Sequence, residues 1–244
     1  MKEKIIAFIK KKVKEANAKG VVIGLSGGLD STTTLFLSVK ALGKDKVFGL
    51  ILPSQVNKKE DIEDVIEVCK KLGVRHRVIE IDSILEYFED VLDLNDKLVK
   101  GNLMARIRMC FLYYFANRDK LLVVGTGNKS EYLQGYFTLH GDVACDLMPL
   151  GNLYKTEVKQ LAEEIGVPKK IIEKIPSPGL WEGQTDEGEL GISYEELDRV
   201  LPLLEKNISV DEIHRKTKID NDRIERVKKR MNKTEFKRKQ IERP

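Results

Sequence analysis

The sequence predicts an α/β fold with a Rossmann-like, doubly wound parallel sheet of about five strands and a helical C-terminal extension. Short runs of Val, Ile and Leu alternate with helical patterns through the first half of the chain, and a glycine-rich turn directly follows the first run. Strands covered on both faces read as continuous apolar runs. Right-handed crossovers then place helices on both faces of one sheet.

Four apolar runs are predicted to be strands, and a short fifth run is predicted to complete the sheet. These strands cover residues 21–25, 47–52, 77–81, 121–124 and 147–150. The segments between and after them carry apolar residues at three- and four-residue spacing, which is the periodicity of amphipathic helices. The predicted helices cover residues 1–20, a segment beginning near Ser31, and residues 59–72, 83–92, 96–117, 155–165, 194–205, 210–216 and 221–237.

The helix over residues 96–117 is unusual because residues 107–115 are apolar or aromatic around much of its circumference. A helix that is apolar on several sides is buried on several sides. Either the core closes over this helix or a second subunit does, and we favour a homodimer contact.

Residues 176–191, with the sequence PSPGLWEGQTDEGELG, are rich in Gly, Pro and acidic residues and are predicted to form a long mobile loop. Loops of this length inside compact domains are usually functional or mobile. Residues 192–244 are expected to be a helical part of the same domain, so residues 1–244 are predicted to form a single domain.

The composition excludes several classes of protein. The chain of 244 residues is 41% hydrophobic and 34% charged, which is typical of an ordered globular protein. No apolar run approaches the roughly 18 residues of a membrane span, and the N-terminal segment lacks the apolar centre of a signal peptide. We therefore expect a cytoplasmic protein with no membrane partner. The three cysteines form no Cys-x-x-Cys pair, so neither a disulfide framework nor a zinc site is supported.

The net charge is only +4, but residues 206–244 hold 14 Lys or Arg against 7 Asp or Glu. Such a basic stretch is compatible with a solvated helix face, contact with a polyanionic ligand or nucleic-acid binding. No aromatic interleaving or nucleic-acid motif accompanies it. We rank the solvated face first and expect no nucleic-acid partner.

The most informative segment is the turn that follows the first strand. Glycines there let successive backbone N–H groups face an anion, and the next helix adds its positive end. The segment lacks the Gly-Lys-Ser/Thr of a Walker A loop. A Gly-Gly pair alone would be an ordinary tight turn, but the whole string after a first strand favours phosphate binding, with Asp30 placed for a hard cation. The residues are Gly24, Leu25, Ser26, Gly27, Gly28, Leu29, Asp30 and Ser31.

This string resembles the S-G-G-x-D-S signature of the N-type ATP pyrophosphatases, which cleave ATP between the α and β phosphates. Three further segments, GNLMARIRM, VGTGNKSEYLQGYFTLHGDVACDLMPLGNLYKTEV and PSPGLWEGQTDEGELG, look like those of ammonia-dependent NAD synthetase. The resemblance covers nearly the whole chain. It implies that ATP adenylylates the nicotinate carboxylate of deamido-NAD, and that ammonia then displaces AMP to give NAD.

The resemblance also implies roles for individual residues. ATP would contact the residues from Gly24 to Ser31 together with Thr126, Lys155 and Ser177, and Mg²⁺ would bind Asp30 and Glu131. Asp30, Lys155 and Asp142 would be catalytic, with Asp142 orienting ammonium. Leu139 and Phe236 depart from the family pattern, since many members have lysine and histidine there. The positions implied to contact deamido-NAD are Arg106, Leu139, Asp146, Phe236 and Lys237.

Two other functions remain open from the sequence. A transfer-RNA thiolase would use the same ATP chemistry but typically adds Cys-x-x-Cys pairs or an RNA-binding appendage. A non-catalytic adenine-nucleotide-binding module would need neither Asp30 nor Glu131. The presence of both acidic residues favours an enzyme.

Overall fold

The computed structural model describes residues 1–239 and contains a parallel sheet with the strand order β3-β2-β1-β4. The strands are β1 (Gly20–Gly24), β2 (Val47–Ile51), β3 (Arg75–Val78) and β4 (Leu121–Val124). The chain passes outward from β1 to β3 and then returns to the other side of β1. The strand order therefore reverses between β1 and β4, which is where open α/β sheets bind ligands. The predicted doubly wound fold is confirmed.

The predicted fifth strand is wrong. Leu147 makes a single parallel bridge with Val124, and the chain then turns, with the N–H of Gly151 donating to the carbonyl of Met148 at 3.2 Å. This turn ends the pairing after one position, so the sheet in residues 1–239 has four strands. The third strand also lies two residues earlier than predicted, and it is a largely exposed edge strand rather than a covered one.

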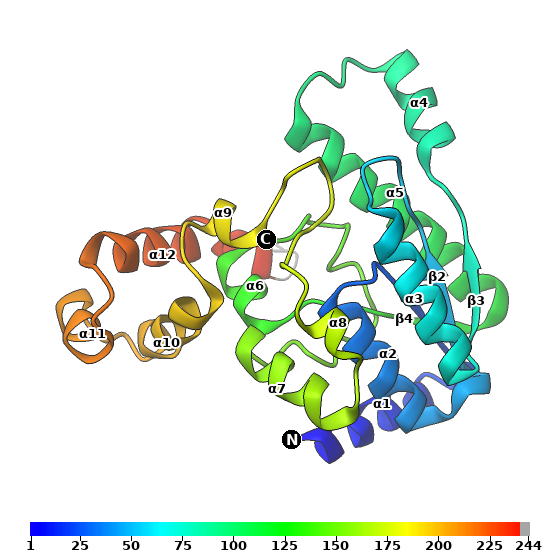
Figure 1. The fold of residues 1–244 in the computed structure, drawn as a ribbon, viewed down its shortest axis with the longest axis horizontal. Helices are drawn as coiled ribbons and strands as arrows, with labels where there is room; N and C mark the ends of the chain where they lie inside the picture. The colour runs from blue at the N-terminus through cyan, green and yellow to red at the C-terminus, as the bar shows by residue number, and fades with distance from the viewer. Residues whose placement is uncertain (240–244) are drawn as a thin grey trace, which may run out of the picture.

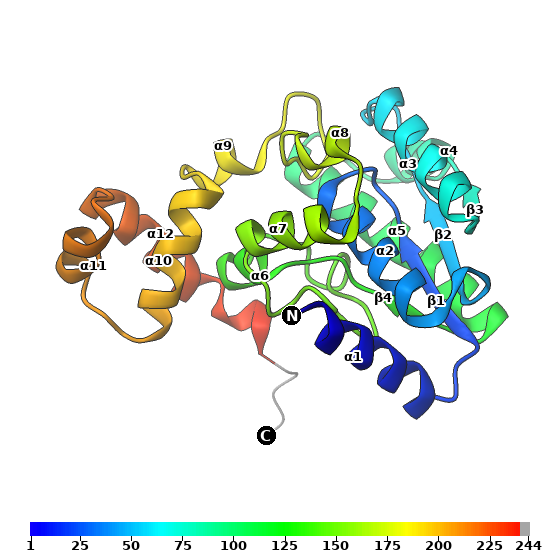
Figure 2. The same ribbon diagram turned by 60° about the horizontal axis from the view of Figure 1, so that its bottom comes forward.

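Helices cover both faces of the sheet. Alternate side chains of the central strand accordingly enter two different apolar cores. Val21 and Ile23 of β1 pack into one core, whereas Val22 packs into the other. The first core is covered by α1 (Lys2–Glu15), α2 (Leu29–Leu42), α3 (Lys59–Leu72), α7 (Lys155–Ile165) and α8 (Lys169–Ile172) (Figure 2). The second core is covered by α4 (Asp82–Val91) and α5 (Lys97–Asp119). A 3₁₀ turn, η1 (Lys44–Lys46), precedes β2.

The C-terminal helices form a third core that lies to one side of the sheet (Figure 1). They are α9 (Asp186–Leu190), α10 (Tyr194–Glu205), α11 (Val210–Thr217) and α12 (Asn221–Lys233), followed by η2 (Glu235–Arg238). Leu133 of α6 (Lys129–Gln134) and Tyr154 pack against this core and connect it to the sheet domain. The last predicted helix ends at Lys233 rather than at residue 237 because the chain tightens into η2.

Within residues 1–239, every helix is too short or too polar to cross a bilayer.

Candidate active site

The predicted phosphate-binding turn lies between β1 and α2 and is organised by two serine hydroxyls. The N–H of Gly28 donates to Ser26 Oγ at 3.2 Å, and Ser31 Oγ donates to the carbonyl of Gly28 at 3.2 Å. The two hydroxyl oxygens lie 3.1 Å apart. Gly27 has a φ of 80°, a conformation that side chains disfavour. The turn is therefore held in a fixed conformation at the N-terminus of α2.

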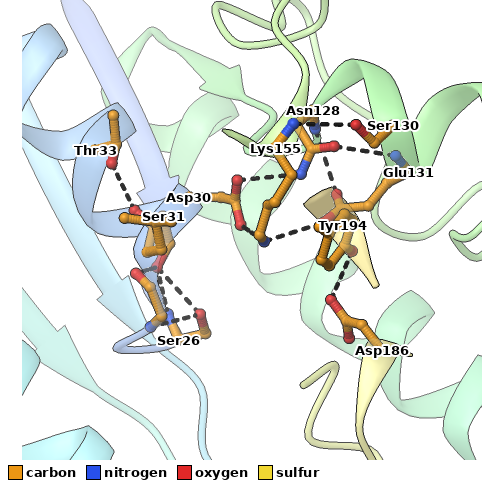
Figure 3. A network of polar contacts seen from close by, with 12 residues as sticks. Ser26, Asp30, Ser31, Thr33, Asn128, Ser130, Glu131, Lys155, Asp186 and Tyr194 are labelled. Atoms are coloured by element: carbon orange, nitrogen blue, oxygen red, sulfur yellow. Dashed lines mark hydrogen bonds and ion pairs between the residues drawn. The ribbon is translucent and has the colours of Figure 1, made fainter. Parts of the chain in front are cut away.

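Three predicted residues from separate elements meet beside this turn (Figure 3). The ammonium of Lys155 forms an ion pair with Asp30 and lies 3.4 Å from Glu131 Oε1. Asn128 donates its side-chain amide to Asp30 Oδ1 at 3.2 Å. The structure thus brings together the two predicted metal ligands and the predicted catalytic lysine.

Local sequence explains how each of these side chains is presented. Glu131 is the third residue of α6 and completes a capping box, in which its N–H donates to Asn128 Oδ1 at 3.0 Å. Asp30 is in the first turn of α2, where the helix dipole favours a carboxylate. Lys155 is the first residue of α7, where the same dipole disfavours a cation. The carboxylates, and not the helix, therefore stabilise the charge of Lys155.

Burial and charge shift the pKa values of this cluster. Burial raises the pKa of Glu131, and the charge of Asp30 adds to that effect against the attraction of Lys155. Burial by itself lowers the pKa of Lys155, but Asp30, Glu131 and Asp186 outweigh it, so the net shift is upward. Lys155 is only 7% exposed, and its ammonium remains charged.

Two further side chains, those of Asp186 and Tyr194, complete the surroundings of Lys155. The ammonium lies 5.1 Å from the centre of the Tyr194 ring, a cation–π contact. Tyr194 donates its hydroxyl to Asp186 Oδ2 at 2.8 Å, and both side chains are buried (Figure 3). Burial also raises the pKa of Asp186. The helical C-terminal part therefore reaches the cluster directly.

A second group of predicted residues gathers at the segment after α6. Arg106 of α5 donates to the carbonyl of Leu139 at 3.2 Å. Asp142 accepts the N–H of Thr138 at 2.7 Å and so closes the turn on which Leu139 lies. The side chains of Arg106 and Asp142 are exposed. These three residues are therefore neighbours.

The remaining predicted residues have separate environments. Asp146 accepts hydrogen bonds from the N–H of Val123 at 2.7 Å and from the hydroxyl of Tyr113 at 3.2 Å. Ser177 Oγ accepts the N–H of Gly179 at 3.2 Å within the loop. Thr126 follows β4 and is half-buried, whereas Phe236 is 63% exposed.

Lys237 is engaged with the backbone after α6. Its ammonium donates to the carbonyls of Gly135 at 2.9 Å and Phe137 at 2.8 Å, and burial lowers its pKa. These two hydrogen bonds attach η2 to the segment that follows α6. They give the basic C-terminal segment a structural contact.

Sequence reasoning missed several residues that shape the site. They are Asn128, Lys174, Asp186, Tyr194 and Asp198. The Asn-x-x-Glu spacing of the capping box at residues 128–131 is a signal that could have identified α6 and Asn128. Lys174 donates to the carbonyl of Gly27 at 3.2 Å and pairs with Asp61 and Asp64 of α3. Nothing local in the sequence indicates that contact.

A phosphate-type turn at the switch point of a parallel sheet, with two carboxylates and a lysine beside it, defines the class of this protein as an α/β nucleotide-dependent enzyme. A model of the NAD synthase family matches residues 1–241. The chain therefore belongs to the NAD synthase family.

Similar proteins carry related names. An NH(3)-dependent NAD(+) synthetase of Methanocaldococcus jannaschii is 55% identical over 239 residues, covering 96% of this chain and 92% of the relative. The solved NH3-dependent NAD synthetase of Campylobacter jejuni is 38% identical with a TM-score of 0.85, and the match covers 100% of this chain and 96% of that one. An NMN synthetase from Francisella tularensis is 36% identical with a TM-score of 0.88, with coverages of 100% and 96%.

Proposed function

We propose that this protein converts deamido-NAD to NAD with ammonia and ATP, releasing AMP and pyrophosphate. The observation that carries the proposal is the position of Lys155, whose buried ammonium joins Asp30 and Glu131 beside the turn at residues 26–31. A triphosphate on that turn would meet a buried cation and, paired with it, two carboxylates able to share a metal. Membership of the NAD synthase family supports the choice of substrate.

The reaction needs two displacements. A nicotinate carboxylate oxygen attacks the α-phosphorus of ATP, the bond from that phosphorus to the bridging oxygen breaks, and pyrophosphate leaves. Ammonia then attacks the carbonyl carbon of the adenylate, loses a proton, and displaces AMP to leave the amide. The contribution of the chain is to position the groups and neutralise the developing charge.

Each member of the cluster has a role in the first displacement. The N–H groups of the turn and the N-terminus of α2 would bind the phosphates. Lys155 would follow the charge that develops on the phosphates, because its stem is fixed at the start of α7 while its ammonium is held only by side chains. Asn128 keeps Asp30 oriented through the bond of 3.2 Å.

Asp30 and Glu131 fit the requirements of Mg²⁺. Magnesium in ATP-dependent enzymes is typically held by one or two carboxylates, with phosphate oxygens and water completing the shell. In residues 1–239, no three His, Cys, Asp or Glu side chains are grouped to hold a metal by themselves. Asp30 and Glu131 already share the cation of Lys155. A pair of carboxylates like this matches a magnesium site whose remaining ligands come from the phosphates and water. Mg²⁺ bound there would offset phosphate charge and stabilise the pyrophosphate leaving group.

The surface formed by Arg106, Leu139 and Asp142 is the proposed position of the pyridine end of deamido-NAD. Arg106 would pair with an anionic group of the dinucleotide, and Asp142 would orient ammonium, since both side chains are exposed next to the turn at Leu139. Asp146 accepts a hydrogen bond from the N–H of Val123 in β4. Its carboxylate oxygens would also accept hydrogen bonds from deamido-NAD. Thr126 and Ser177 are proposed ATP contacts, and Phe236 and Lys237 are proposed dinucleotide contacts.

We also propose that the protein forms a homodimer through α4 and α5. Large apolar side chains are exposed on both helices and on the segment between them: Tyr87, Val91, Leu92, Leu98, Val99 and Tyr114. Tyr114 is 59% exposed in the part of α5 whose sequence is apolar on most sides. Large apolar side chains exposed on helix surfaces are often covered at subunit interfaces.

The test is a product assay with purified protein, ATP, Mg²⁺, ammonium and deamido-NAD. NAD is followed by fluorescence after enzymatic reduction, and pyrophosphate is measured in parallel. Equal amounts of NAD and pyrophosphate are expected. A second arm replaces deamido-NAD with nicotinate mononucleotide, because one structural neighbour is named an NMN synthetase. Faster amidation of the mononucleotide, or release of ADP and phosphate, would overturn the proposal.

A further inference from the structure

Asp198 of α10 joins the N-terminal turns of two helices from outside the catalytic cluster. Its Oδ1 accepts the hydroxyl of Ser130 in α6. Its Oδ2 accepts both the N–H and the hydroxyl of Thr156 in α7, each at 2.8 Å. One carboxylate therefore satisfies donors at the start of both helices, where N–H groups lack partners within the helix.

The two helices are also joined to each other through Ser130. The backbone N–H of Lys155 donates to Ser130 Oγ at 3.0 Å, so the hydroxyl that Asp198 orients also holds the first residue of α7. Ser130 is fully buried. Its neighbours, Asn128 and Glu131, lie beside it in Figure 3.

The residues next to these contacts are the ones that form the cluster. Glu131 directly follows Ser130, and Lys155 directly precedes Thr156. A small rotation of either N-terminal turn would therefore change the separation of 3.4 Å between Lys155 Nζ and Glu131 Oε1. Misplacement of reacting groups by about 1 Å can cost about a hundredfold in rate.

Withdrawing the carboxylate of Asp198 from water costs free energy. Burial raises the pKa of Asp198, while the bonds from Ser130 and Thr156 act in the opposite direction. Its partners are neutral donors rather than cations. Desolvation of this carboxylate therefore offsets part of the stability that its hydrogen bonds and the two helix N-termini supply.

We propose that Asp198 is a positioning residue, which fixes α6 and α7 relative to each other so that Glu131 and Lys155 are presented at the spacing that Mg²⁺ and ATP require. The inference rests on the proposed function. It adds that the C-terminal helices set the geometry of a site at the edge of the sheet, although they have a core of their own. Asp198 itself touches neither Glu131 nor the ammonium of Lys155 in residues 1–239.

The experiment compares Asp198→Ala, Asp198→Asn and a control, Glu196→Ala. Glu196 lies on the same helix but pairs with Arg223 of α12 at 2.8 Å, and so connects α10 to its own core rather than to α6 and α7. The first readout is the dissociation constant of an ATP analogue with a methylene bridge between the α and β phosphates, measured by calorimetry with Mg²⁺. The second is kcat and KM for deamido-NAD.

We expect Asp198→Ala to weaken binding of the magnesium–analogue complex about tenfold and to lower kcat about a hundredfold. KM for deamido-NAD should stay within about twofold, because Asp198 does not contact the surface at Leu139. Asp198→Asn should recover most of the binding, since its amide oxygen can accept from Thr156 and its NH₂ can donate to Ser130 Oγ. Glu196→Ala should lower stability without changing either constant.

Unchanged analogue binding in Asp198→Ala, or an equal loss in Glu196→Ala, would overturn the inference. If Asp198→Ala fails to fold, Thr156→Val removes only the hydroxyl bond and should weaken binding in the same direction, by a smaller factor; an unchanged dissociation constant there would likewise count against it. Absence of NAD formation by the wild-type protein refutes the proposed function instead, and the calorimetric comparison still tests the role of Asp198.

Discussion

The side-chain amide of Asn128 donates a hydrogen bond of 3.2 Å to Asp30, a residue 98 positions earlier in the chain. The bond links the segments that follow β4 and β1, the two strands between which the sheet order reverses. It therefore fixes one proposed metal ligand relative to the helix that carries the other.

Asp30→Asn should lower kcat for NAD formation by at least about a hundredfold, on the scale of lost electrostatic catalysis. The variant removes a carboxylate from the proposed Mg²⁺ site and leaves Lys155 with a weaker partner, while its shape is nearly unchanged. Initial rates at saturating ATP and Mg²⁺ provide the measurement, with Asp45→Asn in the exposed turn η1 as a matched control. A rate near that of the wild type would refute the role of Asp30.

Glu131 should make stability depend on pH with a definite sign. Because its pKa in the folded protein is raised above the ordinary 4.5, the folded state favours the protonated form. The stability associated with that proton is present below pH 4.5 and is lost as pH rises through the raised pKa. Glutamine cannot ionise but preserves the cap, so Glu131→Gln is the reference variant. The unfolding free energy of the wild type minus that of Glu131→Gln should therefore fall as pH rises from about 5 to about 8.

Denaturant unfolding of both proteins at several pH values measures this difference, and ionisations common to both cancel. A difference that is constant with pH, or that rises, would contradict the raised pKa. The same ionisation predicts that the affinity for the magnesium–ATP complex increases with pH over this range, since a metal ligand must be deprotonated.

Gly27→Ala should weaken ATP binding more than about tenfold, because an added Cβ would collide with the carbonyl oxygen of Asp61 and displace the turn. Gly43→Ala is the matched control. Gly43 has a φ of 81°, close to the 80° of Gly27, but no atom lies within 4 Å of the place that an added Cβ would occupy. The strained backbone alone should cost each variant about 1–3 kcal/mol of stability, and the collision with Asp61 should add to this cost in Gly27→Ala. Equal ATP affinity in the two variants would show that the fit of the turn against α3 is unimportant.

Tyr114→Glu should convert the proposed homodimer to a monomer, because it places a charge on the exposed apolar surface of α5. Light scattering after size-exclusion chromatography measures the mass. Ala7→Glu adds the same charge to an exposed position of α1 and should leave the mass unchanged. A wild-type mass equal to that of one chain would rule out the interface.

The order of strands and helices could be predicted because their apolar periodicity is strong and local. The short run at residues 147–150 has the composition of a strand, but Leu147 pairs with Val124 at only one position before the chain turns. The helices α6 and α9 are six and five residues long, too short for a periodic signal. Their starts are marked locally by the capping side chains of Asn128 and Thr185 and by acidic residues in the first turn of each helix.

The candidate site could be predicted in part for a related reason. Asp30, Glu131 and Lys155 occur in recognisable strings, and the structure brings them together. Asp186 lies in the segment predicted to be a loop, and Tyr194 and Asp198 are ordinary residues of a predicted helix. The importance of all three comes from contacts made by the C-terminal helices. Such contacts depend on tertiary packing, which periodicity does not encode.

The attachment of α10 to α6 and α7 also constrains synthesis of the protein. A nascent chain that has left the ribosome only as far as α9 already contains every strand of the described sheet and the glycine turn, but it lacks the carboxylate that aligns Ser130 and Thr156. ATP in the cell would then find an incomplete receptor on the growing polypeptide. On the proposed role of Asp198, we expect nucleotide binding to assist folding only after translation has passed α10, and we expect a protease cut between α9 and α10 to weaken nucleotide binding.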